Sequence, residues 1–135
     1  MDIRITELKD IYDPEFQTFF NEWQSDIEQF FTHFDLEESG LCVVYKLEVE
    51  DVMAGVFLYI PKGLEAHIEI DYLIPIYRDL GIGKEFFSQK EAQFKSEGFE
   101  KMVSLTDDEA HKNYLLSLGF EKSTKHPHRY SKKLA

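Results

Sequence analysis

At 135 residues the chain is long enough for one packed domain and too short for two independent cores, so we expect a single domain over residues 1–135. Its hydrophobic fraction of 43% and aromatic fraction of 15% exclude a disordered chain. The formal net charge of −11 disfavours nucleic acid and anionic membranes as partners, because both are bound through basic patches, and mildly favours a cationic substrate such as an amine.

The N-terminal segment has no basic stretch followed by an apolar run, and no other stretch is apolar for long enough to cross a bilayer. We therefore expect a cytoplasmic protein that does not enter a membrane. Ile3 and Ile5 alternate with polar neighbours, which predicts a first strand over residues 2–8.

A long aromatic helix is predicted next. Asp13 is a plausible N-cap, and Pro14 fits the first helical position. The apolar residues recur at three- and four-residue spacing: Phe16, Phe19, Phe20, Trp23, Ile27, Phe30, Phe31 and Phe34. Such a stripe usually packs against a core, although some of these rings could instead line an apolar acceptor pocket.

Two β-rich runs, residues 41–47 and 52–60, are joined by an acidic turn over residues 48–51, which indicates a hairpin. The first run holds the only cysteine of the chain, Cys42, so no disulfide can form within the chain. Because an apolar setting raises the pKa of a thiol, we interpret Cys42 as a core residue rather than a nucleophile.

A further strand is predicted over residues 66–74, and Pro75 ends it. A helix follows from about residue 81 to residue 98, since Gly98 fits the position after a helix end. The alternation of the strand places Ile68, Ile70, Tyr72 and Ile74 on one face and His67, Glu69, Asp71 and Leu73 on the other.

The last part of the chain alternates strand and helix again. Residues 101–105 are predicted as a strand, and Thr106 is a candidate N-cap for a short helix that Gly119 ends. Residues 120–122 and 128–132 can pair as the last strands. This order of elements, without repeats or linkers, implies one mixed α/β sheet.

The segment from Tyr77 to Lys84 lies between a strand and a helix and contains two glycines, Gly81 and Gly83. Glycines at such a junction let the backbone approach a ligand closely, and the helix N-terminus favours an anion. The spacing excludes both the P-loop and the dinucleotide fingerprint. The pattern therefore predicts a phosphate-binding turn of another kind.

This segment resembles the acyl-CoA-binding signature of the GNAT superfamily of N-acyltransferases, Arg/Gln-x-x-Gly-x-Gly/Ala, through Arg78, Gly81 and Gly83. The preceding Leu73-Ile-Pro-Ile-Tyr77 also matches the residues that lead into the signature in that superfamily. Leu-Gly-Phe at residues 118–120 is similar to the end of a later family motif. The resemblance covers about the last half of the chain.

The resemblance implies a single-domain GNAT fold of the α/β class, in which helices flank a mixed, mostly antiparallel sheet that splays between its fourth and fifth strands. It implies acetyl-CoA as co-substrate, an amine as acceptor, and no metal. The backbone of Leu73 and Ile74 would pair with the pantetheine arm. Backbone amides would bind the pyrophosphate across Arg78, Asp79, Leu80, Gly81, Ile82, Gly83 and Lys84.

The general acid is less clearly marked. In the family it is often a tyrosine four residues before the glycine of Leu-Gly-Phe, but that place is taken by Leu115. Tyr114, one place earlier, either presents its hydroxyl to the leaving thiol or packs in the core. The asparagine that often begins this helix in the family is replaced by Asp107 or Asp108.

Glu69 and Asp71 are the candidates for the base that deprotonates the acceptor ammonium, because both lie on the fourth strand near the expected splay. Either could instead be a surface charge. Asp71 stands where the family usually has an apolar residue, which favours a polar neighbour or a substrate amine. His126 and His128 have no third ligand nearby and predict no metal site.

The sequence thus predicts an N-acetyltransferase that acts on a primary amine of a small molecule or of a peptide or protein. One alternative is a CoA-binding regulatory or accessory module without turnover, which the lack of a tyrosine at position 115 favours. Another is an interaction protein whose aromatic first helix mediates formation of a homodimer, with the glycine turn purely structural.

Overall fold

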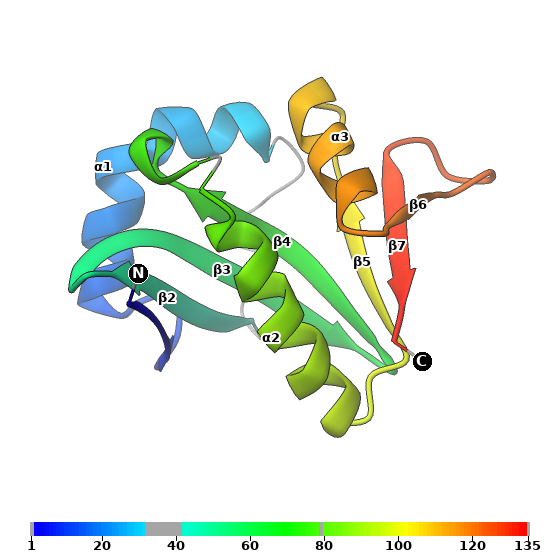
Figure 1. Ribbon diagram of the computed structural model, residues 1–135, viewed down its shortest axis with the longest axis horizontal. Coiled ribbons are helices and arrows are strands. Elements are labelled where there is room, and N and C mark those ends of the chain that lie inside the picture. The colour runs from blue at the N-terminus through cyan, green and yellow to red at the C-terminus, as the bar shows by residue number, and fades with distance from the viewer. Residues whose placement is uncertain (1, 32–41, 79, 135) are drawn as a thin grey trace.

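The computed structural model describes residues 2–31, 42–78 and 80–134. Together they form one sheet with helices on both faces (Figure 1). The elements are β1 (Ile3–Leu8), α1 (Pro14–Phe30), β2 (Val43–Val49), β3 (Val52–Lys62), β4 (Glu65–Leu73), the 3-10 helix η1 (Pro75–Tyr77), α2 (Ile82–Ser96), β5 (Lys101–Leu105), α3 (Glu109–Ser117), β6 (Glu121–Lys122) and β7 (Arg129–Lys133).

The sheet has the strand order β1-β2-β3-β4-β5-β7-β6. Neighbouring strands pair antiparallel except β4 and β5, which pair parallel. The prediction of one mixed, mostly antiparallel sheet is therefore confirmed. None of the helices in the described parts of the chain is both long and apolar enough to cross a membrane.

Each face of the sheet carries its own core. The helix α1 packs on one face. Its predicted start is confirmed: Pro14 is the first helical residue, and the Asp13 side chain accepts a hydrogen bond from the Glu15 amide at 2.9 Å. The helices α2 and α3 pack on the other face. The predicted stripe is mostly core, with Phe16, Phe19, Phe20, Ile27 and Phe31 buried, Trp23 and Phe30 partly buried, and Phe34 outside the described residues.

A β-bulge at Glu69 changes the predicted faces of β4. Leu58 pairs with Ile70 while its neighbour Tyr59 pairs with Ile68, so Glu69 is the extra residue. Ile68 therefore packs on the α2 face, whereas Ile70 packs on the α1 face. The prediction that Ile68 shares a face with Ile70 is wrong, because strict alternation does not hold across a bulge.

Beyond the bulge the strands β4 and β5 separate. Their parallel pairing covers only Glu65–Ile68 of β4 and Lys101–Ser104 of β5. Figure 1 shows the two strands together at the lower right and apart toward the top, with α3 beside the open end. The predicted splay is thus present, and Asp71 and Leu73 lie on the part of β4 that borders it.

The N-cap of α3 differs from the prediction. Asp108, rather than Thr106, caps the helix, since its side chain accepts a hydrogen bond from the His111 amide at 2.8 Å. The Thr106 hydroxyl instead accepts from the Asp108 amide at 3.2 Å. Cys42 precedes β2 and is half-buried against the α1-side core, and burial raises the pKa of its thiol. That environment agrees with a packing role.

Lys90 is a buried cation on the inner side of α2. Its side chain is covered by Tyr45, with the ammonium 3.3 Å from the ring centroid, and it donates a hydrogen bond to Gln93 at 2.7 Å. Burial lowers its pKa to about 8, and the charges of Glu97 and Glu7 offset only part of this effect. The folded protein therefore holds this proton less tightly than the unfolded chain.

We expect the free energy of unfolding to rise with pH between the folded pKa of Lys90, about 8, and its unfolded value of 10.5, because the unfolded chain binds more protons in this window. Lys90→Met should remove this part of the slope. Urea unfolding of both proteins at several pH values from about 7 to about 9.5 measures it. The control variant Lys62→Met, at an exposed position of β3, should keep the wild-type slope. If Lys90→Met also kept that slope, the prediction would be contradicted.

Candidate functional site

The N-terminus of α2 offers a group of free backbone amides. Gly81 is the N-cap in a left-handed conformation, with φ of 76°, which glycine adopts without strain. The first hydrogen bond of the helix runs from the Glu85 amide to the Gly81 carbonyl at 3.1 Å. The amides of residues 82–84 precede this bond and have no acceptor within the helix. Together with the helix dipole, they form an anion-binding position.

The end of β4 presents the backbone of Leu73 to the splay. The Ile74 amide donates to the Ala54 carbonyl of β3 at 2.9 Å, and the Ile74 carbonyl accepts from the Tyr77 amide at 3.0 Å. Backbone groups of successive strand residues point to opposite sides, so the N–H and C=O of Leu73 point away from β3. Of the two residues predicted to pair with a pantetheine arm, Leu73 is the one whose backbone faces the splay.

Arg78 lies at the start of the glycine turn, but its side chain is directed toward α1. Its Nε donates to the Leu73 carbonyl at 2.9 Å, and its Nη2 donates to Asp26 at 2.8 Å. The Tyr72 hydroxyl also donates to Asp26, at 2.6 Å. This bond and the contact with Arg78 lower the pKa of Asp26, although burial by itself would raise it. The guanidinium therefore ties α1 to the end of β4.

The remaining residues of the turn differ in exposure. Leu80 is exposed, Gly81 and Lys84 face solvent, and Ile82 is buried in the α2-side core. Asp79 lies outside the described residues. The predicted phosphate-binding turn is thus an exposed backbone segment in front of a buried helix start.

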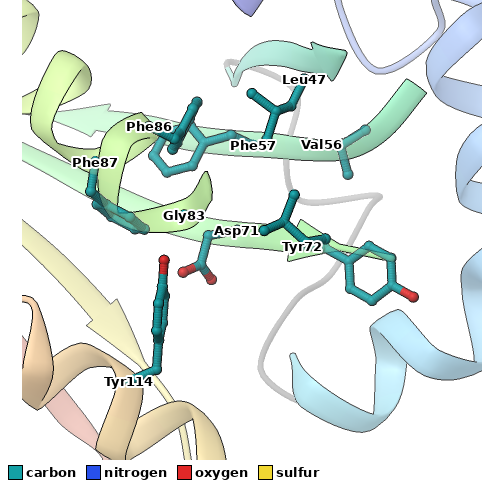
Figure 2. A pocket seen from close by; sticks show the side chains of 10 residues that line it. Leu47, Val56, Phe57, Asp71, Tyr72, Gly83, Phe86, Phe87 and Tyr114 are labelled. Carbon is teal, nitrogen blue, oxygen red and sulfur yellow. The ribbon is translucent and has the colours of Figure 1, made fainter. Parts of the chain in front are cut away.

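A small cavity lies between the end of β4, the start of α2 and α3 (Figure 2). Its volume is about 20 Å³, which is enough for one water molecule. Figure 2 shows the Asp71 carboxylate and the Tyr114 hydroxyl pointing toward each other, while Tyr72 points away toward α1. The lining is otherwise apolar: Leu47, Val56, Phe57, Leu73, Gly83, Phe86 and Phe87, beside Tyr72.

Tyr114 reaches this cavity from α3, whereas Leu115 is fully buried in the core. The ring of Tyr114 packs edge-on against Phe87 and stacks with His111, at centroid distances of 6.1 and 6.4 Å. Burial and the nearby charge of Asp71 raise the pKa of the Tyr114 hydroxyl, which keeps its proton. The structure therefore places this hydroxyl, one position earlier than the family pattern, at the splay.

Gly83 is in direct contact with Tyr114. A Cβ atom built at position 83 would overlap the Tyr114 hydroxyl, so only glycine fits without a shift of α2 or α3. The second glycine of the signature is thus explained by the close approach of a side chain as well as by the free amides.

His111 is a site residue that the sequence reasoning missed. Its Nε2 lies 2.9 Å from Asp71 Oδ1, and both side chains are buried, with exposed fractions of 6% and 4%. Burial alone would lower the pKa of His111, but the charge and hydrogen bond of Asp71 and the charge of Asp108 outweigh it and raise that pKa. The spacing of His111 and Tyr114, three residues apart on one helix face, was the available signal.

The pair leaves two buried atoms without a hydrogen-bond partner among the described residues, Asp71 Oδ2 and His111 Nδ1. The ring of Phe31, the C-cap of α1, packs edge-on against the imidazole at 5.1 Å. Buried polar atoms without partners are rare in folded proteins and mark places where a water molecule or a substrate is expected.

Glu69 is separate from this group. It occupies the bulge of β4, half-buried, and its charge contributes to raising the pKa of Cys42. It does not line the cavity that Asp71 and Tyr114 share. Within residues 2–31, 42–78 and 80–134, no group of three or more His, Cys, Asp or Glu side chains is placed to hold a metal ion.

A sheet that splays beside helix N-terminal amides, with a tyrosine hydroxyl and a carboxylate at the junction, is a site suited to thioester transfer. The model of the acetyltransferase (GNAT) family matches residues 5–120 of the sequence. Because this match spans most of the chain, the protein belongs to the GNAT family and is an acetyl-CoA-dependent N-acetyltransferase.

Solved structures share the fold at low identity. An acetyltransferase of the GNAT family from Staphylococcus aureus Mu50 aligns with a TM-score of 0.73 and 16% identity, over 99% of this chain and 100% of that one. The ribosomal-protein-S18-alanine N-acetyltransferase from Escherichia coli aligns with a TM-score of 0.70 and 15% identity, over 99% and 95%.

The PaiA N-acetyltransferase from Thermoplasma acidophilum, whose structure contains coenzyme A, aligns with a TM-score of 0.68 and 16% identity, over 98% of this chain and 99% of that one. A comparison with curated protein sequences gives no match. At these identities the structural likeness shows the fold, and the acceptor has to be argued from the site itself.

Proposed function

We propose that this acetyltransferase transfers the acetyl group of acetyl-CoA to a primary amine of a small molecule or of a peptide. The observation that carries the proposal is the junction in Figure 2, where Asp71 and Tyr114 face each other beside Gly83. Amide formation from a thioester requires a polarised carbonyl, an unprotonated amine and a proton for the leaving thiolate. The junction offers a group for each of these requirements.

The cofactor would bind along the free backbone groups. The amides of residues 82–84 and the helix dipole suit the pyrophosphate, and Lys84 adds a positive charge in the same turn. Of the two outward backbone groups of Leu73, the carbonyl already accepts from Arg78 Nε, so the N–H is the one open to the acyl end of the cofactor. The acetyl end of the cofactor would lie at the cavity between β4 and α3.

The chemistry would be divided among three groups. The Leu73 N–H would polarise the thioester carbonyl, and the Tyr114 hydroxyl would donate its proton to the leaving sulfur. The Asp71 carboxylate, together with a chain charge of −11, favours a cationic ammonium as acceptor. Arg78 would act indirectly, by fixing the start of the glycine turn to α1 through Asp26.

Calorimetry of the purified protein with CoA and with acetyl-CoA at physiological salt tests the cofactor. We expect one bound cofactor per chain, because the site has a single helix N-terminus beside a single splay. Release of free thiol from acetyl-CoA, followed over a panel of primary amines, then tests the transfer. At least one amine should accelerate the release.

Absence of binding to either form of the cofactor would refute the proposed site. Cofactor binding without thiol release for any amine would instead identify a CoA-binding module without turnover. The two results are distinguishable, since binding depends on the amides of α2 and turnover also depends on Asp71 and Tyr114.

A further inference from the structure

The pair formed by Asp71 and His111 is unusual because both side chains are buried. Two groups that can carry charge are buried next to an apolar cavity, where desolvation is costly. The strand β4 carries a second histidine–carboxylate pair, His67 and Glu65, at the same distance of 2.9 Å. That pair has exposed fractions of 16% and 32%, lies where β4 is paired with β5, and is thus only partly buried.

The two oxygens of Asp71 have different environments. Oδ1 is held by His111 Nε2, whereas Oδ2 is buried and has no partner among the described residues. Asp71 also lines the cavity that it shares with Tyr114, and that cavity has room for one water molecule. An oriented carboxylate with one free oxygen at the point of reaction is suited to accept a proton, directly or through that water.

We propose that Asp71 is the catalytic base of the transfer and that His111 is its positioning residue, an inference that rests on the proposed acetyltransferase function. The acceptor ammonium gives one proton to Asp71 Oδ2. The freed lone pair forms the C–N bond to the acetyl carbon, and the C–S bond breaks. The leaving sulfur takes the Tyr114 proton, the amide nitrogen's second proton restores Tyr114, and Asp71 releases its proton to solvent.

The protonation of His111 controls this base. Among the described residues, the titratable groups that face the imidazole are Asp71 from β4, Asp108 at the start of α3 and Tyr114 one turn later, while Phe31, the C-cap of α1, contributes an apolar ring. An imidazolium at position 111 forms an ion pair with the Asp71 carboxylate, and a proton transferred to Asp71 breaks that ion pair. A neutral His111 still donates its Nε2 proton to Asp71, and no ion pair is lost when Asp71 takes up a proton. Transfer should therefore increase as pH rises through the raised pKa of His111.

His111→Gln separates orientation from titration, because a glutamine side chain can donate to Asp71 but cannot become charged. We measure thiol release from acetyl-CoA against pH for wild type, His111→Gln, Asp71→Asn and His67→Gln. The acceptors are a peptide with only an α-amino group, a peptide with only a lysine amine, and water alone. The ammonium pKa values of the two peptides differ by about 2.5 units, so the part of the pH profile that belongs to the enzyme can be distinguished.

In His111→Gln we expect the acidic limb of the kcat/KM profile to move to lower pH by about one unit or more, with the maximal rate largely retained. Asp71→Asn should lower kcat by about 10²- to 10⁴-fold with little change in acetyl-CoA affinity by calorimetry. His67→Gln should match wild type in its acidic limb, its kcat and its affinity for acetyl-CoA.

An unchanged acidic limb in His111→Gln, or near-wild-type kcat in Asp71→Asn, would overturn the inference while leaving the proposed function intact. If the wild type binds no cofactor, or releases no thiol with these acceptors or with any amine of the wider panel, the proposed function and this inference fail together. A titration of the His111 ring by NMR, with CoA and without it, needs no acceptor. We expect its pKa to shift on cofactor binding, and identical titration curves would also count against the inference.

Discussion

Gly83→Ala should weaken CoA binding by about 5- to 150-fold, since the overlap of the new Cβ with the Tyr114 hydroxyl costs about 1–3 kcal/mol. The ring of Tyr114 is held between Phe87 and His111, so it cannot turn away freely. The strain should instead displace the start of α2, which carries the amides of residues 82–84. The fold should survive, because alanine is a better helix former than glycine. Calorimetry with CoA measures the loss, and circular dichroism checks the fold.

A double variant identifies the cause. Tyr114→Phe removes the overlapping hydroxyl, and the next atom of the ring, Cζ, would be 3.1 Å from the new Cβ. Gly83→Ala should therefore recover most of its CoA affinity when it is combined with Tyr114→Phe. Ser88→Ala, at an exposed position of α2, should bind CoA as wild type does. Wild-type affinity in Gly83→Ala alone would contradict the assignment of these amides.

Local signals in the sequence predicted much of this fold. The Asp13 cap and Pro14 give the start of α1, and the glycines at positions 81 and 98 bracket α2, because these residue types have strong backbone preferences. The splay after Ile68 was predicted from the family resemblance alone. Nothing in the alternation of β4 marks where it leaves its neighbour, since that depends on pairing with a strand more than thirty residues away.

The site was predicted in outline and missed in its connections. The bulge at Glu69 has no turn residue to reveal it, and it decides which side chains of β4 face α2. The partners of Asp71 and Arg78 are His111 and Asp26, which are distant in sequence, so only the tertiary structure brings them together. Glu69 and Asp71 were both candidate bases from the sequence, but only Asp71 lines the cavity.

His111→Leu should lower the free energy of unfolding by about 3–5 kcal/mol, because it leaves the Asp71 carboxylate buried without its partner. The pH dependence follows from the raised pKa of His111. The stabilisation from the charged imidazole is fully present below the unfolded pKa of 6.5 and is lost as pH rises through the folded pKa. The cost of His111→Leu should therefore be larger near pH 6 than near pH 9, as urea unfolding of the cofactor-free protein can show.

Replacing both members of the pair tests why it is retained. An apolar pair of similar volume is often as stable as a buried ion pair, so Asp71→Val combined with His111→Leu should recover most of the lost stability. The same double variant should still bind CoA, because neither residue belongs to the amides of α2, and it should release no thiol when amines are added. A double variant as unstable as His111→Leu would show that the pair serves the fold. A stable and inactive one would show that stability alone does not explain two buried polar groups at the splay.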